Sequence, residues 1–218
     1  MSARGGLAIC VMVSGGGTNL QVIMDRVGDG YLAGCRIGLV ISSRKDAYAL
    51  VRAEGAGLET AVVPPKGFAD VAGYDAAVLG LLERHGIGLI VLAGFASKLG
   101  PEVVRRYEGR VVNVHPALMP SFCGKGLYGI RPHVAALEYG VKVTGATVHF
   151  IEEEYDTGAI ILQKAIEVHG CDTPETLQRR VMEECEWVIL PQAIKLISEG
   201  RVLRDGRKVT VLGEGCGH

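Results

Sequence analysis

The chain has 218 residues, enough for one large α/β domain with a substantial core or for two small domains. Hydrophobic residues make up 48% and charged residues 22%, an ordinary balance for a globular protein. Lys plus Arg number 23 and Asp plus Glu 24, and the net charge of −1 argues against a nucleic-acid or membrane surface. The apolar run near the start has only seven residues before a glycine turn and is too interrupted for a signal peptide or a spanning helix. We therefore expect a soluble, cytoplasmic protein.

The first structural signal is a strand followed by a glycine-rich turn. Leu7 to Val13 is continuously apolar, as in a parallel strand covered on both faces. Ser14–Asn19 follows with three consecutive glycines, and apolar residues then recur at helical spacing from Leu20 to Val27. Glycines let the backbone approach a ligand, and a helix N-terminus presents free N–H groups, so this stretch predicts a phosphate site. It matches neither a Walker loop nor a G-x-G-x-x-G turn, and a merely tight turn is the alternative.

Strands and helices continue to alternate. Arg36–Ile41, Thr60–Val63 and Leu89–Ala93 are predicted strands, and Ala47–Ala53 and Tyr74–Arg84 are predicted helices. This order predicts a single doubly wound, Rossmann-like α/β domain, with a mostly parallel central sheet and helices on both faces.

The most informative stretch is the predicted strand whose core is Val111 and Val112. Asn113 and His115 project to one face of it, and Pro116 ends it because proline has no N–H for the sheet ladder. Ligands of open α/β sheets bind beyond the carboxyl ends of the strands. An amide and an imidazole there can direct two donors at one oxygen, as oxyanion stabilisation in acyl transfer requires. The alternative is that both side chains cap the strand end.

Two loops follow strands at this same edge. Gly94–Leu99 lies past the strand that ends at Ala93, and it either lines a ligand pocket or is an ordinary βα loop. Phe122–Gly129 is longer than most βα loops and rich in glycine, which suggests a lid. Arg131–Tyr139 is then a predicted helix closed by a glycine.

The second half contains an acidic turn between two predicted strands, Lys142–Ile151 and Ala159–Leu162. Glu152, Glu153 and Glu154 are expected on a solvated loop. Asp156 differs, because the Thr-Gly pair after it lets the backbone fold inward. A carboxylate beside His115 would favour the imidazolium and raise the pKa of that histidine.

The C-terminal part predicts a helix and a hairpin. Asp172–Glu175 opens the last long helix with a cap residue, a proline and an acid, and Pro191 should bend this helix. Arg201–Leu212 contains an Asp-Gly pair typical of a hairpin turn. The six cysteines form no C-x-x-C pair and are expected to be reduced thiols, and Cys216 with His218 lacks further ligands for zinc, so no metal is expected.

Three separated stretches together resemble one family. They are Ser14–Leu20, Asn113–Pro116, and His149–Phe150 continuing through Asp156–Gly158. In this order and spacing the chain is similar to the glycinamide ribonucleotide formyltransferases, folate-dependent enzymes of purine synthesis, from Leu7 to about Leu212. The resemblance implies one formyltransferase domain over residues 1–218, with a phosphate-binding half to about residue 110 and a catalytic and folate half after it.

The family resemblance also implies roles for individual residues. The implied catalytic residues are Asn113, His115 as proton donor, and Asp156, which raises the pKa of His115. The implied contacts to glycinamide ribonucleotide are Gly17, Thr18, Asn19 and Glu186. The implied folate contacts are Ala96, Ser97, Lys98, Leu99, Asn113, Glu152, Glu153, Glu154, Tyr155 and Asp156. The co-substrate would be 10-formyltetrahydrofolate, the partners would be small molecules without nucleic acid or membrane, and the protein would be a monomer or homodimer.

The chain departs from the family pattern in three places. Val71 stands where a basic residue often reaches the folate, Ala117 replaces a serine, and the loop Phe122–Tyr128 is longer than in many relatives. These changes bear on folate contacts and loop behaviour.

Other functions remain open from the sequence. Methionyl-tRNA formyltransferases and formyltetrahydrofolate hydrolases share the catalytic trio but carry a further domain, for which we expect no room here. A nucleotide-sensing module would keep the glycine loop without turnover, so loss of turnover in His115→Ala separates it from an enzyme. A dehydrogenase is disfavoured by the glycine spacing.

Overall fold

The computed structural model describes residues 6–152 and 157–213, and the chain divides into two compact units, residues 1–112 and 113–218. Strands are hydrogen-bonded in the order β3-β2-β1-β4-β5-β6-β7, and the boundary between the units falls inside β5. The pairs β1/β2, β1/β4 and β2/β3 are parallel, whereas β6/β7 is antiparallel. The predicted α/β class and mostly parallel sheet are therefore confirmed.

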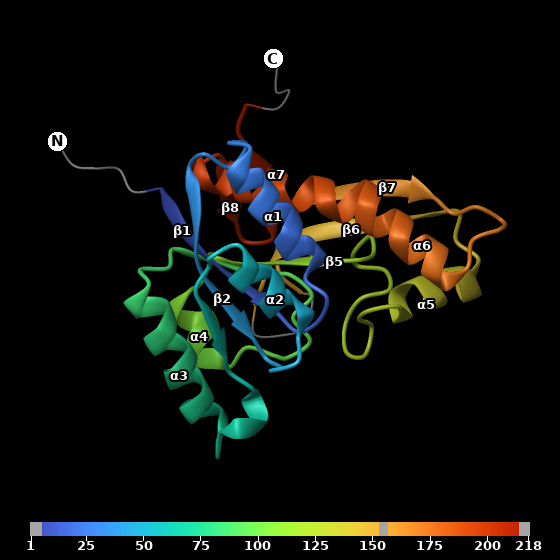
Figure 1. The fold of residues 1–218 in the computed structure, drawn as a ribbon. Helices are drawn as coiled ribbons and strands as arrows, with labels where there is room; N and C mark the ends of the chain where they lie inside the picture. The colour runs from blue at the N-terminus through green and yellow to red at the C-terminus, as the bar shows by residue number, and fades with distance from the viewer. Residues whose placement is uncertain (1–5, 153–156, 214–218) are drawn as a thin grey trace. The chain divides into compact units, whose positions relative to one another are not determined.

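The first unit alternates strands and helices around β1 (Figure 1). Its elements are β1 (Leu7–Val13), α1 (Thr18–Gly28), β2 (Cys35–Ser42), α2 (Tyr48–Gly55), β3 (Thr60–Val62), the 3₁₀ turn η1 (Pro65–Gly67), α3 (Val71–Arg84), β4 (Leu89–Leu92) and α4 (Pro101–Arg106). The side chains of β1 from Ile9 to Val13 have no solvent exposure, and β1 is paired with a strand on each edge, as expected for an inner strand of a parallel sheet whose two faces are covered. The first predicted strand has the predicted bounds.

The helix α4 is absent from the sequence-based prediction. Its signals are Pro101 at the first helical turn, Glu102 in that turn and two arginines in the last turn. Asp75 on α3 supplies the missing cap, because its buried carboxylate accepts a 2.9 Å hydrogen bond from the Glu102 N–H. A Cβ at Gly100 would lie 2.0 Å from this carboxylate, so only glycine fits there. The cap comes from a different helix, which local sequence does not reveal.

The second unit is built on an antiparallel pair of long strands. Its elements are β5 (Val111–His115, whose last three residues lie in this unit), α5 (Arg131–Tyr139), β6 (Val143–Phe150), β7 (Ile160–Glu167), α6 (Pro174–Val181), the π-helical segment η2 (Met182–Glu186), α7 (Trp187–Ser198), β8 (Val202–Asp205) and β9 (Lys208–Val211). Helices α5 and α6 pack together, as Figure 1 shows in yellow-green and orange. The predicted C-terminal hairpin is present as the antiparallel pair β8/β9.

Two predictions in this unit need correction. The strand predicted to end at Leu162 continues to Glu167. The prediction stopped too early because the second half of β7 contains exposed polar residues and lacks a continuous apolar pattern. The last helix is interrupted at η2, which precedes α7 and its internal Pro191. Proline cannot bond the carbonyl four residues back, here that of Trp187, and the departure from α geometry ends immediately before that residue.

Among the described residues, Cys10, Cys35, Cys123, Cys171 and Cys185 take part in no disulfide bond. Within the same part of the chain, none of the helices is both long enough and apolar enough to cross a lipid bilayer.

Candidate active site

In the first unit, the glycine turn between β1 and α1 has the backbone geometry of an anion-binding loop. Gly17 is the residue before α1 and adopts a left-handed conformation with φ of 73°. A Cβ at Gly17 would lie 2.6 Å from the Cβ of Ala49, so the turn requires glycine. Gly15 and Gly16 are exposed, and a Cβ at either would meet no atom within 4 Å. Their backbone is therefore accessible to a ligand.

The loop is held from α2. The Ala49 N–H donates to the Gly15 carbonyl at 3.0 Å, and Arg52 Nε donates to the Gly16 carbonyl at 2.9 Å. The carbonyls of Gly15 and Gly16 are therefore bonded to α2. The N-terminus of α1 has neither a capping side chain nor an acidic residue in its first turn. Its positive end suits an anion such as phosphate.

A serine connects this loop to the second predicted loop of the same unit. Ser14 Oγ accepts a 2.8 Å hydrogen bond from the Ala96 N–H and lies 2.6 Å from Ser43 Oγ. The structure thus brings the predicted phosphate loop beside the segment Ala96–Leu99. Lys98 is exposed and Leu99 is buried, so the last residue of this segment contributes to the core.

In the second unit, the amide of Asn113 is oriented by a buried histidine that sequence reasoning left without a role. His149 Nδ1 lies 2.8 Å from the Phe150 carbonyl, which only accepts, so Nδ1 carries the hydrogen. In the neutral ring Nε2 is then an acceptor, and Asn113 Nδ2 donates to it at 3.2 Å. This leaves the second N–H of the Asn113 amide for another oxygen. The sequence feature that could have indicated this role of His149 is its position on the alternating strand β6.

His115 is the last residue of β5 and is buried, with 4% of the residue exposed. Its Nε2 lies 2.9 Å from the Phe122 carbonyl, and because a carbonyl only accepts, Nε2 carries a proton. Phe122 has φ of 50° and, within residues 6–152 and 157–213, is alone among non-glycine residues in having a positive φ. Such strain is characteristic of functional sites. The two donors predicted at this strand end are thus an amide N–H and an imidazole N–H.

A further histidine, His133 on α5, is buried close enough to His115 for their charges to interact. Burial is the main cause that lowers the pKa of His133 to about 4, and the charge of His115 lowers it further. Neither ring nitrogen of His133 has a hydrogen-bond partner in the structure. His133 is consequently neutral at physiological pH.

The remaining predicted residues of this unit are placed differently. Glu152 forms an ion pair with Arg204 on β8, so this carboxylate is not simply solvated. Glu186 ends the π-helical segment and is 9% exposed, in contrast to the solvated position expected by default from the helical pattern. π-Helical segments often occur at functional sites. The predicted residues Glu153, Glu154, Tyr155 and Asp156 lie outside the described residues.

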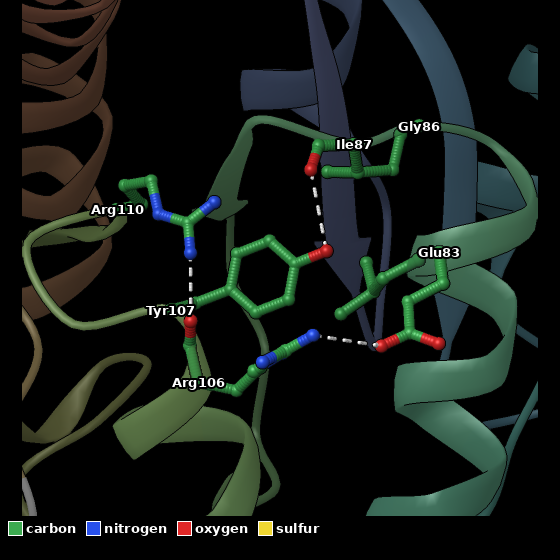
Figure 2. A pocket seen from close by; sticks show the side chains of 7 residues that line it. Glu83, Gly86, Ile87, Arg106, Tyr107 and Arg110 are labelled. Atoms are coloured by element: carbon green, nitrogen blue, oxygen red, sulfur yellow. Dashed lines mark hydrogen bonds and ion pairs between the residues drawn. The ribbon is translucent and has the colours of Figure 1, made fainter.

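A pocket of about 420 Å³ in the first unit is unrelated to these residues (Figure 2). In it, the Tyr107 hydroxyl donates to the Ile87 carbonyl at 3.2 Å, and Arg106 faces Glu83 at 3.7 Å. Ile87 lies at the amino end of β4, whereas ligands of parallel sheets bind beyond the carboxyl ends of the strands. The pocket therefore lies between the end of α3 and the end of α4, away from the edge where a ligand is expected. Among the described residues, no group of three His, Cys, Asp or Glu side chains could hold a metal ion.

Known proteins resemble this chain over most of its length. The formyl transferase family model matches residues 7–194. Phosphoribosylglycinamide formyltransferase of Haemophilus influenzae is 39% identical over 198 residues, which cover 90% of each protein. A chloroplastic phosphoribosylglycinamide formyltransferase of Arabidopsis thaliana is 37% identical over 195 residues, and the chain spans about two thirds (66%) of its length.

Solved structures extend the likeness to the fold. The crystal structure of glycinamide ribonucleotide transformylase 1 from Symbiobacterium toebii has a TM-score of 0.89 and 39% identity, and the match covers 97% of this chain and 96% of that one. These similarities cover both the glycine loop and the Asn-x-His strand end. The chain therefore belongs to the formyl transferase family.

Proposed function

We propose that this chain transfers the formyl group of 10-formyltetrahydrofolate to the amine of 5'-phosphoribosylglycinamide. The names of the Haemophilus and Symbiobacterium relatives support this substrate. The observation that carries the chemistry is the end of β5, where Asn113 and His115 each carry an N–H donor. Two such donors match the needs of a tetrahedral intermediate whose carbonyl oxygen becomes negative.

In this proposal the phosphate of the nucleotide binds to the turn at Gly17, Thr18 and Asn19. The exposed backbone of Gly15 and Gly16 and the positive end of α1 support this assignment. Glu186 would contact the glycinamide part of the substrate, where a carboxylate can accept from an ammonium or amide N–H.

The formyl transfer proceeds by addition and elimination. The substrate amine attacks the formyl carbon, the new C–N bond forms, and the carbonyl oxygen becomes an oxyanion. The second N–H of Asn113 and the Nε2–H of His115 stabilise that oxygen. To do so, the Nε2–H of His115 breaks its hydrogen bond to the Phe122 carbonyl and donates to the oxyanion instead. The bond between the formyl carbon and N10 of the folate then breaks. N10 receives a proton, the amine loses one, and Asp156 keeps His115 charged as a proton donor.

The folate would lie against Ala96–Leu99 and against the segment from Glu152 to Asp156, and the scheme needs no metal. The assignments rest on the family resemblance, and for the first segment also on its bond to Ser14. We further propose a single catalytic domain that acts on small molecules in the cytoplasm as a monomer or homodimer.

The test uses the purified full chain with glycinamide ribonucleotide and 10-formyltetrahydrofolate. We expect loss of the formyl group from folate only when the nucleotide is present, with one formylated product per folate consumed. Deformylation without nucleotide, accompanied by formate, would identify a formyltetrahydrofolate hydrolase instead. Nucleotide binding without any folate turnover would identify a binding module.

A further inference from the structure

The segment that follows His115 is held by a pair of side chains on neighbouring strands. Thr147 on β6 and Gln163 on β7 are directly opposite each other in the antiparallel register. Thr147 Oγ1 lies 2.7 Å from the Ala117 carbonyl and 3.1 Å from the Met119 N–H. Gln163 Nε2 lies 3.0 Å from the Met119 carbonyl and 3.0 Å from Thr147 Oγ1. We call these two side chains and their bonds to Ala117 and Met119 the Thr-Gln clasp.

The chemistry of these groups assigns every hydrogen. The Ala117 carbonyl only accepts, so the Thr147 hydroxyl donates its single hydrogen there. The hydroxyl oxygen then accepts from the Met119 N–H and from Gln163. Because the Met119 carbonyl also only accepts, the amide nitrogen of Gln163 must face the clasp, and both of its hydrogens are used. The clasp therefore requires a hydrogen-bond donor at position 163.

Met119, which the clasp holds, lies three residues before Phe122, whose carbonyl bonds His115. Met119 is held by both clasp side chains, and a turn closed by the Ser121 N–H on the Leu118 carbonyl at 3.0 Å follows. Phe122 comes next, with its strained positive φ and its carbonyl on His115 Nε2. The conformation of this segment thus depends on contacts from β6 and β7.

We propose that Gln163 is a positioning residue, which acts through the Thr-Gln clasp to place the Phe122 carbonyl against His115 and so to hold the His115 ring in orientation until the substrate oxygen takes the place of that carbonyl. This inference rests on the proposed function. Gln163 is exposed on β7, whereas Thr147 has no solvent exposure. A glutamine on an exposed strand position contributes little to the core, so its role here is hydrogen-bond donation to the segment after His115.

The test compares three substitutions at position 163. Gln163→Glu has the same shape but only accepts, Gln163→Leu neither donates nor accepts, and Gln163→Lys only donates. Lys164→Leu, at the neighbouring exposed position of β7, is the control. Loss of one such hydrogen bond corresponds to about a three- to tenfold effect. We expect the smallest loss of kcat in Gln163→Lys, a larger loss in Gln163→Leu and the largest, about tenfold, in Gln163→Glu. The KM for the nucleotide should be unchanged in all three variants. In Lys164→Leu, kcat should change less than about twofold.

Amide hydrogen exchange at Met119, measured by NMR in the absence of substrates, tests the clasp independently of turnover. We expect about tenfold faster exchange in Gln163→Glu and near wild-type exchange in Gln163→Lys, with thermal midpoints within a few degrees of each other. If wild-type protein transfers no formyl group but the exchange pattern holds, the proposed function fails and the clasp stands. Wild-type kcat in Gln163→Glu would overturn the positioning role, as would equal losses in the glutamate and lysine variants.

Discussion

At the scale of single residues, the end of β5 shows how neutral neighbours set up a donor pair. His149 is oriented by the Phe150 carbonyl and in turn orients the amide of Asn113. His115 donates to the Phe122 carbonyl, an acceptor that a substrate oxygen can replace. Each donor is held by a group that accepts, so both N–H bonds are available without a change of tautomer.

His115→Ala should lower kcat about 1,000-fold, since general acid–base groups typically contribute 10²–10⁴-fold. Nucleotide affinity, measured by calorimetry, should be unchanged, because the proposed phosphate loop is in the other unit. His169→Ala replaces an exposed histidine and is the control. A loss of less than tenfold in kcat would show that His115 does not act in the chemistry.

The buried His133 predicts a specific pH dependence of stability. Its pKa is lowered to about 4 by burial first and by His115 second, so the unfolded chain binds a proton that the folded protein resists. Stability from this group is complete above its ordinary pKa of 6.5 and is lost as the pH falls towards 4. Between pH 7.5 and pH 5 the loss should be about 2 kcal/mol.

Urea unfolding of wild type and His133→Leu at both pH values isolates this effect. The wild-type free energy of unfolding should decrease more on acidification than that of the variant. Equal decreases in the two proteins would mean that His133 titrates normally in the folded state.

At the scale of elements, the junction of β1 and α1 requires glycine for two separate reasons. Gly17 has a left-handed backbone and lies against Ala49, whereas Gly15 needs neither feature. The π-helical segment before α7 is a second local departure, and it ends with the buried Glu186. Both departures occur at residues proposed to contact the nucleotide.

Gly17→Ala should destabilise the protein by about 2 kcal/mol or more, through the left-handed conformation and the contact with Ala49. Its nucleotide affinity should fall as the turn moves. Gly15→Ala is the matched control, because its Cβ meets no atom within 4 Å, and it should retain wild-type stability. Thermal unfolding distinguishes the two variants, and equal thermal midpoints would contradict the geometry of the turn.

At the scale of the molecule, each unit contains thiols that report on its folding. Cys10 and Cys35 are buried in the first unit and Cys185 in the second, whereas Cys171 is exposed. Burial raises the pKa of Cys185 to about 11 and that of Cys10 further, which suppresses their reactive thiolates.

Native protein treated with iodoacetamide at pH 8 should therefore be modified at Cys171 but not at Cys10, Cys35 or Cys185. Peptide mass spectrometry before and after addition of urea gives the pattern, and the three buried thiols should react only in urea. Modification of Cys10 or Cys35 alone under native conditions would show that the first unit opens independently.

Most of the fold follows from local pattern. Continuous apolar runs predicted the buried strands; β1 and α5 have the expected bounds, and β5 ends at the expected residue. The helix α4 and the second half of β7 were missed, because a cap from Asp75 and pairing with β6 stabilise them from outside the segment. Short or polar elements depend on such contacts, which residue spacing does not encode.

For the site, the sequence by itself determined the chemical groups: a glycine turn before a helix, and an amide and an imidazole two residues apart at a strand end. Only the tertiary structure decided their hydrogen bonds. It joined Asn113 to His149, His115 to the Phe122 carbonyl, and the segment after His115 to Thr147 and Gln163. The reason is physical: strand periodicity sets which face a side chain occupies, but hydrogen-bond partners distant in the chain meet only when strands pair and loops close.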